Sequence, residues 1–256
     1  MLTKFAAVAV ICALASTAGA TESLRFGVEA EYPPFEYKLP SGELAGIDID
    51  IGNAVCAKLQ IKCTWVETPF DAMISALISR KFDVINSAMW STEQRRKQID
   101  FTSVIYVTPA RLLARADSHL LPTAESLKGK RVGVPVGDTS SDYAMVHWAS
   151  HGVNVVSYPS QEAIWADLQA GRIDASIESQ MTAQAGFLDK PEGKGFAFLG
   201  APLVDPKVFG DGVALGLRKQ DQALRTRLNR ALAELKKDGT LDKITQRYFS
   251  TRIVAP

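Results

Sequence analysis

Two stretches of this sequence repeat the same order of residue types. Residues 77–84 read LISRKFDV and residues 168–175 read LQAGRIDA, so each passes from helical positions through a basic and an apolar residue to an aspartate. The residues after each aspartate are typical of a buried strand. This repetition predicts two similar α/β units and argues against one long sheet.

Hydrophobic periodicity extends this pattern on both sides of each repeat. Segments that alternate in hydrophobicity predict strands, and segments with apolar residues at helical spacing predict helices between them. A succession of strand, helix and strand favours mostly parallel sheets covered by helices. The expected strands are 24–28, 61–65, 82–87, 132–134, 153–156, 173–177 and 213–217, and the expected helices include 47–59, 140–148, 161–170 and one striped by Leu224, Leu228, Leu232 and Leu235.

The first twenty residues have the features of a secretory signal peptide. Lys4 precedes an apolar run at 5–15, and Ala18-Gly19-Ala20 supplies the small residues of a cleavage site. A membrane anchor is the alternative, but the run is shorter than the roughly 18 apolar residues of a spanning helix. We expect cleavage after Ala20. Removal of Lys4 from 29 basic residues leaves 28 against 28 acidic residues, a balance that offers no footprint for nucleic acid.

The two cysteines beyond this leader, Cys56 and Cys63, predict a short disulfide. An exported chain enters an oxidising compartment, and this spacing without nearby histidines is a poor zinc pattern. Two buried free thiols are the alternative. The bond would tie the end of one helix to the next strand.

Enzymatic and cofactor signatures are missing from the sequence. None of the motifs G-x-x-x-x-G-K-[ST], G-x-G-x-x-G, H-E-x-x-H or G-x-S-x-G occurs. His147 and His151 have i,i+4 spacing, but no acid completes a ligand set, so we expect them to face solvent. The sequence predicts no cofactor and no metal.

A binding cleft between the two units is a simpler hypothesis. Ligands of open parallel sheets lie beyond the carboxyl ends of the strands, which points to residues 29–35, 86–92, 137–141 and 178–180. Arg95, in a helix expected to be capped by Ser91, is suited to grip a carboxylate through two charge-assisted hydrogen bonds. A plain surface arginine is the alternative.

Other residues of these loops suit the remaining parts of a small zwitterion. The turn Gly137-Asp138-Thr139-Ser140 opens a helix and offers N–H donors, unless it is only an N-cap. Glu29 would meet a cation, and Tyr32 and Phe70 would flank a flat or aliphatic group. A solvated glutamate and two core aromatics are the alternative.

Ordered motifs over residues 24–250 resemble the periplasmic solute-binding proteins of family 3, in particular the lysine/arginine/ornithine- and histidine-binding receptors of polar amino acid ABC importers. The motifs are Tyr32-Pro33-Pro34-Phe35, Gly46-Ile47-Asp48-Ile49-Asp50, Cys56-x6-Cys63-Thr64-Trp65, Phe70-Asp71-Ala72, Thr92-x-x-Arg95, Ser126-Leu127-Lys128-Gly129-Lys130, Gly171-Arg172-Ile173-Asp174-Ala175, Phe209-Gly210-Asp211-Gly212 and Leu217-Arg218-Lys219.

This resemblance implies a two-lobed α/β fold, the type II periplasmic binding protein fold, with hinge strands near 106–111 and 203–212. Lobe 1 would comprise 21–108 and 209–256, and lobe 2 would comprise 109–208. Such receptors are periplasmic, bind no nucleic acid, close on an amino acid and deliver it to an inner-membrane permease. We expect a monomer, because closure and docking require no oligomer.

The resemblance also assigns roles to site residues. Arg95, with Ser87 and Thr139, would hold the α-carboxylate, Ser140 would belong to the same turn, Tyr32 and Phe70 would flank the side chain, and Glu29 would meet its cationic end. Ala88 and Trp90 stand where serines are usual and make the wall more apolar. Ser179 replaces the usual aspartate partner of the α-ammonium, and Asp138 is the residue that could take over.

These departures leave alternatives beside a plain basic amino acid. Ser179 with Glu29 resembles receptors for opines, which are amino acids substituted on the α-nitrogen. A cyclohexadienyl dehydratase on the same scaffold is a weaker alternative, since no acid–base pair stands out. A receptor that signals to a separate sensor protein is another.

Overall fold

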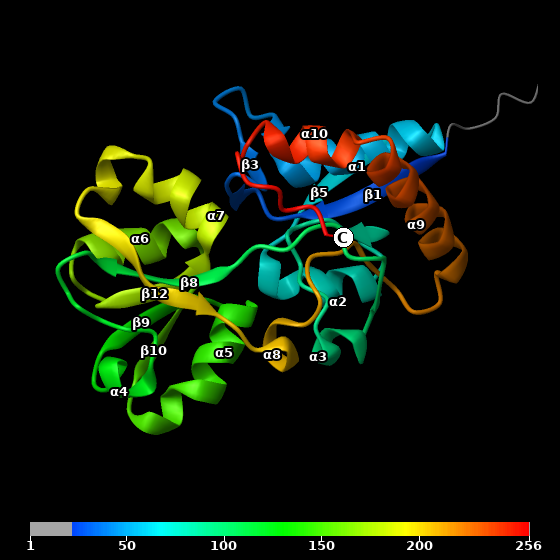
Figure 1. Ribbon diagram of the computed structural model, residues 1–256. Coiled ribbons are helices and arrows are strands. Elements are labelled where there is room, and N and C mark those ends of the chain that lie inside the picture. Colours follow the sequence, from blue (N-terminus) through cyan, green and yellow to red (C-terminus); the bar gives the residue numbers. More distant parts are fainter. Residues whose placement is uncertain (1–21, 256) are drawn as a thin grey trace, which may run out of the picture.

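The computed structural model describes residues 22–255, and the expected signal peptide at 1–20 lies outside them. Two five-stranded sheets form separate halves of the molecule, each with helices on its faces (Figure 1). The two α/β units predicted from the repeated segments are confirmed. Both sheets are mixed, because in each of them one strand runs antiparallel to the other four.

The first sheet has the order β5-β1-β6-β13-β7. Parallel pairing joins β5, β1 and β6, and the late strand β13 inserts antiparallel between β6 and β7. Its strands are β1 (Ser23–Val28), β5 (Lys62–Glu67), β6 (Val84–Ile85), β7 (Asp100–Phe101) and β13 (Gly216–Leu217). A small antiparallel sheet follows β1 and consists of β2 (Glu31–Tyr32), β3 (Glu36–Lys38) and β4 (Leu44–Ala45).

The second sheet has the order β10-β9-β11-β8-β12, with β10, β9 and β11 parallel. Strands β8 and β12 pair antiparallel at the other side, where the chain enters and leaves this half. Its strands are β8 (Ala110–Arg115), β9 (Arg131–Pro135), β10 (Asn154–Tyr158), β11 (Ala175–Ser179) and β12 (Phe196–Leu203).

Helices bury apolar stripes against both sheets. Residues such as Ile47, Ile51 and Val55 of α1 face Leu228 and Leu232 of α9 in the core of the first half. The helices of that half are α1 (Ile47–Leu59), α2 (Met73–Ile78), α3 (Glu93–Arg96), α9 (Gln222–Lys237) and α10 (Thr240–Gln246). Those of the second half are α4 (Ala124–Leu127), α5 (Thr139–His147), α6 (Gln161–Gln169) and α7 (Gln180–Ala183), and α8 (Pro206–Phe209) lies on the returning segment.

The chain passes twice between the halves. It leaves the first sheet after β7 and enters the second at β8, then returns from β12 to β13. The two crossing segments touch, because Tyr106 bridges Val213 in antiparallel fashion. This agrees with the hinge strands expected near 106–111 and 203–212. The exact lobe limits, 21–108 with 209–256 and 109–208, stay a prediction.

The predicted disulfide joins Cys56 of α1 to Cys63 of β5, with the two Cα atoms 5.9 Å apart. Replacing both cysteines with alanine should lower the free energy of unfolding by about 2–3 kcal/mol, because the unfolded chain loses a closed loop. Denaturant unfolding checks this. Ligand affinity should stay unchanged, since neither cysteine lines the pocket described below. The expectation would be contradicted if the alanine variant, the reduced parent and the oxidised parent all had the same free energy of unfolding.

Candidate functional site

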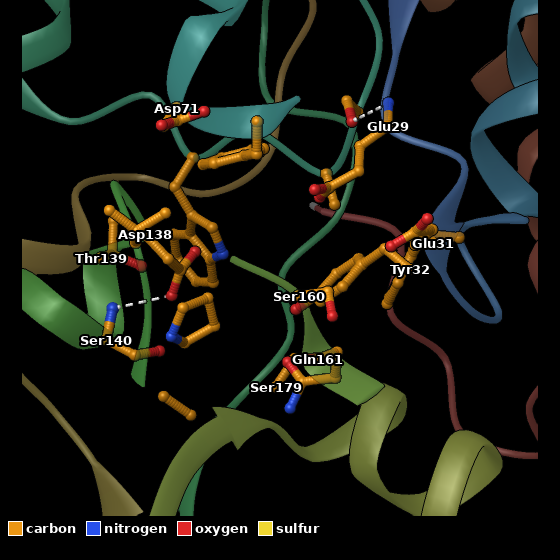
Figure 2. Close-up of a pocket in the computed structure, with 18 of the residues that line it drawn as sticks. Glu29, Glu31, Tyr32, Asp71, Asp138, Thr139, Ser140, Ser160, Gln161 and Ser179 are labelled. Atoms are coloured by element: carbon orange, nitrogen blue, oxygen red, sulfur yellow. Dashed lines mark hydrogen bonds between the residues drawn. The ribbon is translucent and has the colours of Figure 1, made fainter. Parts of the chain in front are cut away.

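A pocket of about 790 Å³, part of which is open to solvent, lies between the two halves (Figure 2). Its walls come from the carboxyl ends of β1, β6, β9 and β11, as expected for ligands of parallel strands. Ten of the predicted site residues line it, namely Glu29, Tyr32, Phe70, Ser87, Ala88, Trp90, Asp138, Thr139, Ser140 and Ser179. Arg95 is the predicted residue that does not.

Arg95 is buried and bridges the two halves instead of facing the pocket. Its Nη1 donates to the Trp90 carbonyl at 2.9 Å, and its Nη2 donates to the Gly137 carbonyl of the opposite half at 2.9 Å. The guanidinium lies over the Phe70 ring, 5.3 Å from its centroid. Burial lowers the pKa of Arg95, but guanidinium keeps its charge in proteins. Arg95 therefore adjoins the pocket wall and faces the turn that we predicted.

The cap of the Arg95 helix differs from the expectation. The N-cap is Thr92, whose hydroxyl accepts the Arg95 backbone N–H at 3.2 Å, and the prediction that Ser91 caps this helix is wrong. Ser91 is bound elsewhere, because its hydroxyl donates to the Gly212 carbonyl at 3.0 Å. Serine and threonine are both favourable N-cap residues. The contact of Ser91 with Gly212 distinguishes the two positions in the folded protein.

The turn Gly137-Asp138-Thr139-Ser140 opens α5, as predicted. Asp138 is its N-cap, and Oδ1 accepts the Ser140 backbone N–H at 2.8 Å. Gly137 has a φ of 74°, and a Cβ there would lie 3.3 Å from the Asp71 Cα of the other half. Glycine thus permits both the left-handed turn and the close approach of the two halves.

The pocket is strongly acidic. Four carboxylates line it, from Glu29, Glu31, Asp71 and Asp138, and among the described lining residues there is no lysine, arginine or histidine. Burial raises the pKa of Glu29 to about 7, and the nearby Glu31, Asp138 and Asp71 carboxylates add to the rise. Sequence reasoning named neither Glu31 nor Asp71 as a site residue, although Glu31 lies in the loop 29–35 and Asp71 in the motif Phe70-Asp71-Ala72. The site is suited to a cation.

A buried carboxyl pair supports the wall at Ser87 and Ala88. The Ser87 hydroxyl accepts the Glu29 backbone N–H at 3.0 Å and donates to Glu36 Oε1 at 2.8 Å. Its hydrogen is therefore directed away from the pocket. Asp48 accepts the Ala88 N–H at 2.6 Å and the Tyr106 hydroxyl at 2.8 Å.

One proton on Glu36 explains this pair. Glu36 and Asp48 are fully buried, and burial raises the pKa of Glu36 well above its ordinary value and that of Asp48 to about 6. Asp48 is the anion, because its carboxylate accepts one N–H donor, from Ala88, and one O–H donor, from Tyr106. Sequence reasoning missed both residues, since a carboxylate in an apolar motif carries no signal of its partner.

The aromatic side chains occupy the expected wall positions. Tyr32 stacks on Phe35 with centroids 5.8 Å apart, and Phe70 carries the Arg95 guanidinium on one face. Trp90 packs against Phe209 of the returning segment at 6.0 Å. These rings pack partly in the core and partly line the pocket. The two alternatives given for Tyr32 and Phe70, core aromatics and pocket wall, are therefore both correct in part.

Two polar residues at the start of α6, Ser160 and Gln161, were not predicted and also line the pocket. Ser160 is the N-cap of α6, and its hydroxyl accepts the Ala163 N–H at 3.3 Å. In the view of Figure 2, Gln161 and Ser179 lie low in the pocket and Glu29 and Asp71 lie at its top. An N-cap serine after a strand was the available signal.

Several residues outside the pocket are held by structural contacts. Glu178 points away from it, as strand alternation predicts, and accepts the Trp165 indole N–H at 2.7 Å. His147 does not simply face solvent, because its Nε2 lies 2.7 Å from Asp205 Oδ2. Within residues 22–255, no group of histidine, cysteine or acidic side chains is arranged to hold a metal ion, and no helix is long and apolar enough to cross a membrane.

Comparison with known proteins places this architecture. The profile of the family "Bacterial extracellular solute-binding proteins, family 3" matches residues 24–251. The chain belongs to this family. A lysine/arginine/ornithine-binding periplasmic protein of Escherichia coli (strain K12) is 44% identical over 241 residues, which cover 94% of this chain and 93% of that protein. A histidine-binding periplasmic protein of the same strain is 44% identical over 237 residues, or 93% and 91% of the two chains.

The solved structures agree with the sequence relatives of this family 3 protein. An ancestral arginine-binding protein bound to arginine superposes with a TM-score of 0.81 at 34% identity, covering 89% of this chain and 98% of that one. The protein is thus a periplasmic solute-binding protein of an ABC transporter and has the two-lobed fold that the resemblance implied. Its relatives are named as binding proteins, not as enzymes.

Proposed function

We propose that this protein captures a basic amino acid between its two halves and delivers it to an inner-membrane permease. The observation that carries the proposal is the acidic pocket, which Glu29, Glu31, Asp71 and Asp138 line without a basic side chain among the described lining residues. Names of relatives that include lysine, arginine, ornithine and histidine support the same class of ligand.

The ligand's ends are assigned by the charges around them. Glu29, at the top of the view in Figure 2, receives the cationic end of the side chain, and Tyr32 and Phe70 flank its aliphatic part. The α-carboxylate lies toward Thr139 and Arg95. There it replaces the neutral Gly137 carbonyl as the partner of Nη2, because charge-assisted hydrogen bonds are the stronger ones.

Calorimetric titration of the mature protein with arginine, lysine, ornithine and histidine tests this function. At least one of the four should bind. The protein's affinity for acidic or small neutral amino acids should be lower by about a hundredfold or more. Failure of all four, while acidic amino acids bind, would refute the proposal. Uptake assays in cells that lack a candidate permease identify the transport partner.

Arginine affinity should rise about tenfold between pH 6 and pH 8. The cation binds the ionised form of Glu29, whose pKa of about 7 leaves roughly a tenth of it ionised at pH 6 and nine-tenths at pH 8. The guanidinium of arginine keeps its charge over this range, so the rise does not come from titration of the side chain that meets Glu29. Titration calorimetry in buffers of different ionisation enthalpy should also detect the released proton.

Glu29→Gln is the control for this pH dependence. It should weaken arginine binding by about tenfold or more at pH 8 and flatten the pH profile, because no carboxyl is left to ionise at that position. A slope that persists in this variant would assign the proton to another group.

A further inference from the structure

The chain segments that cross between the halves meet at Tyr106. This residue is fully buried, and its backbone carbonyl accepts the N–H of Val213 in the returning segment at 2.9 Å. Antiparallel bridges pair Tyr106 with Val213 and with Val254, close to the end of the described chain. Tyr106 therefore joins three segments that are far apart in the sequence, at the start of the hinge strand expected near 106–111.

Tyr106 does not line the pocket, but two sets of contacts connect it to residues that do. Its hydroxyl donates to Asp48 Oδ1 at 2.8 Å, and Asp48 Oδ2 accepts the backbone N–H of Ala88, a lining residue, at 2.6 Å. Its ring stacks on Phe35 with centroids 5.3 Å apart, and Phe35 stacks on Tyr32 at 5.8 Å. Phe35 and Tyr32 both line the pocket. The pocket wall and the crossing segments are thus joined through one buried side chain.

The backbone of Ala88 depends on this connection. Ala88 has a φ of 44°, in the left-handed region that residues with a side chain avoid. Such a conformation persists only where neighbouring groups hold it. The Asp48 carboxylate is such a group, because it is buried and its hydrogen bond to the Ala88 N–H is charge-assisted. The direction of the Asp48 carboxylate therefore determines the shape of the wall at Ala88.

We propose that Tyr106 is a positioning residue for ligand capture: it orients the Asp48 carboxylate, which holds the Ala88 backbone in the pocket wall, so that this wall and the crossing segments move as one body. The inference rests on the proposed function for its ligand probe, arginine. Loss of the Tyr106 hydroxyl takes a buried donor from Asp48 Oδ1, which is costly for a buried acceptor. The carboxylate then turns toward other donors and releases the Ala88 N–H.

Tyr106→Phe tests this, because it removes the hydroxyl and keeps the ring that stacks on Phe35. Arginine affinity should fall about fivefold to tenfold, as for the loss of one buried hydrogen bond. Stopped-flow kinetics should assign the fall to faster dissociation, with the association rate constant within about twofold of the parent. Encounter depends on the charges of the pocket, which the variant keeps, whereas retention depends on the wall. A merely structural role would lower the melting temperature without changing the dissociation rate.

Tyr248→Phe is the matched control. The Tyr248 hydroxyl donates to Asp50 Oδ2 at 2.9 Å, so this variant also loses a tyrosine–aspartate hydrogen bond to helix α1. Neither Tyr248 nor Asp50 lines the pocket. Both rate constants for arginine should stay within about twofold of the parent, because this bond has no contact with the pocket wall.

A second measurement needs no ligand. Amide hydrogen exchange of a peptide that covers residues 84–92 should be about tenfold faster in Tyr106→Phe and unchanged in Tyr248→Phe. The proposal is overturned if this peptide exchanges as in the parent, or if the two variants change arginine dissociation by equal factors. Failure of the parent to bind arginine would refute the proposed function, and the exchange rates would still decide the role of Tyr106.

Discussion

Replacing Arg95 with alanine should weaken arginine binding by about a hundredfold or more. The guanidinium bonds to Trp90 in its own half and to Gly137 in the other, at 2.9 Å each. Its loss removes the cation nearest the predicted carboxylate position and a contact between the halves. It also leaves the Asp138 and Asp142 carboxylates without the positive charge that they face. Titration calorimetry measures the loss, and circular dichroism confirms that the variant is folded.

Arg96→Ala is the matched control for this prediction. Arg96 is the next residue of the same short helix, but its guanidinium pairs with the exposed Asp211 at 3.2 Å. Arginine affinity should change by no more than about twofold, as expected for an exposed ion pair. Arg95→Lys should give an intermediate loss, because lysine keeps the charge but not the planar pair of donors. Unchanged arginine binding by the Arg95→Ala variant would show that the guanidinium does not contribute to ligand binding.

Asp48→Asn should lower the free energy of unfolding by about 3 kcal/mol, because the amide accepts with one atom where the carboxylate accepts with two. The new NH2 group would oppose either the Tyr106 hydroxyl or the Ala88 N–H, both of which donate to Asp48. The melting temperature should fall by roughly 6–12 °C. Asp50→Asn, on the partly exposed side of the same helix, should cost much less, and an equal cost would contradict the account.

Glu36→Gln should be close to neutral in stability at pH 5 and stabilising relative to the parent at pH 8. The glutamine oxygen accepts from Ser87 and its NH2 donates toward Asp48, as the protonated acid does. Glu36 has a raised pKa in the folded protein, so its stabilising contribution is complete below its unfolded value of about 4.5 and is lost as the pH rises. Unfolding curves at both pH values check this sign. A parent and variant with parallel pH profiles would show that Glu36 is not the proton carrier.

Much of the fold could be predicted because local patterns determine it. The repeat at 77–84 and 168–175 correctly predicts two α/β units, and the strands and helices follow their hydrophobic periodicity. The two-residue strand β13 is different. Residues 213–217 are all apolar or glycine, and only pairing with β6 and β7 limits the strand to Gly216–Leu217. Long-range pairing of this kind has no local signal.

The residues of the candidate site also differ in whether a local sequence pattern or a long-range contact determines their role. Residues at the carboxyl ends of strands, such as Glu29, Ser87 and Ser179, line the pocket as predicted from topology. Gln161 and Glu36 were missed because their importance depends on their surroundings. Among residues 22–255 the Gln161 amide has no hydrogen-bond partner, and Glu36 is buried beside Asp48, which is twelve positions away. The position of Arg95 beside the pocket wall, and not in it, likewise depends on the Gly137 carbonyl of the other half.

The interior position of β13 has a consequence for how the protein assembles during export. All strands of the second sheet come from residues 110–203, so that half possesses its complete set before the last fifth of the polypeptide emerges from the membrane. The other half lacks an inner strand, and the α9 and α10 covering of α1, until the very end. A nascent or truncated product ending near residue 205 should therefore contain one finished unit and one with a gap, open to periplasmic proteases.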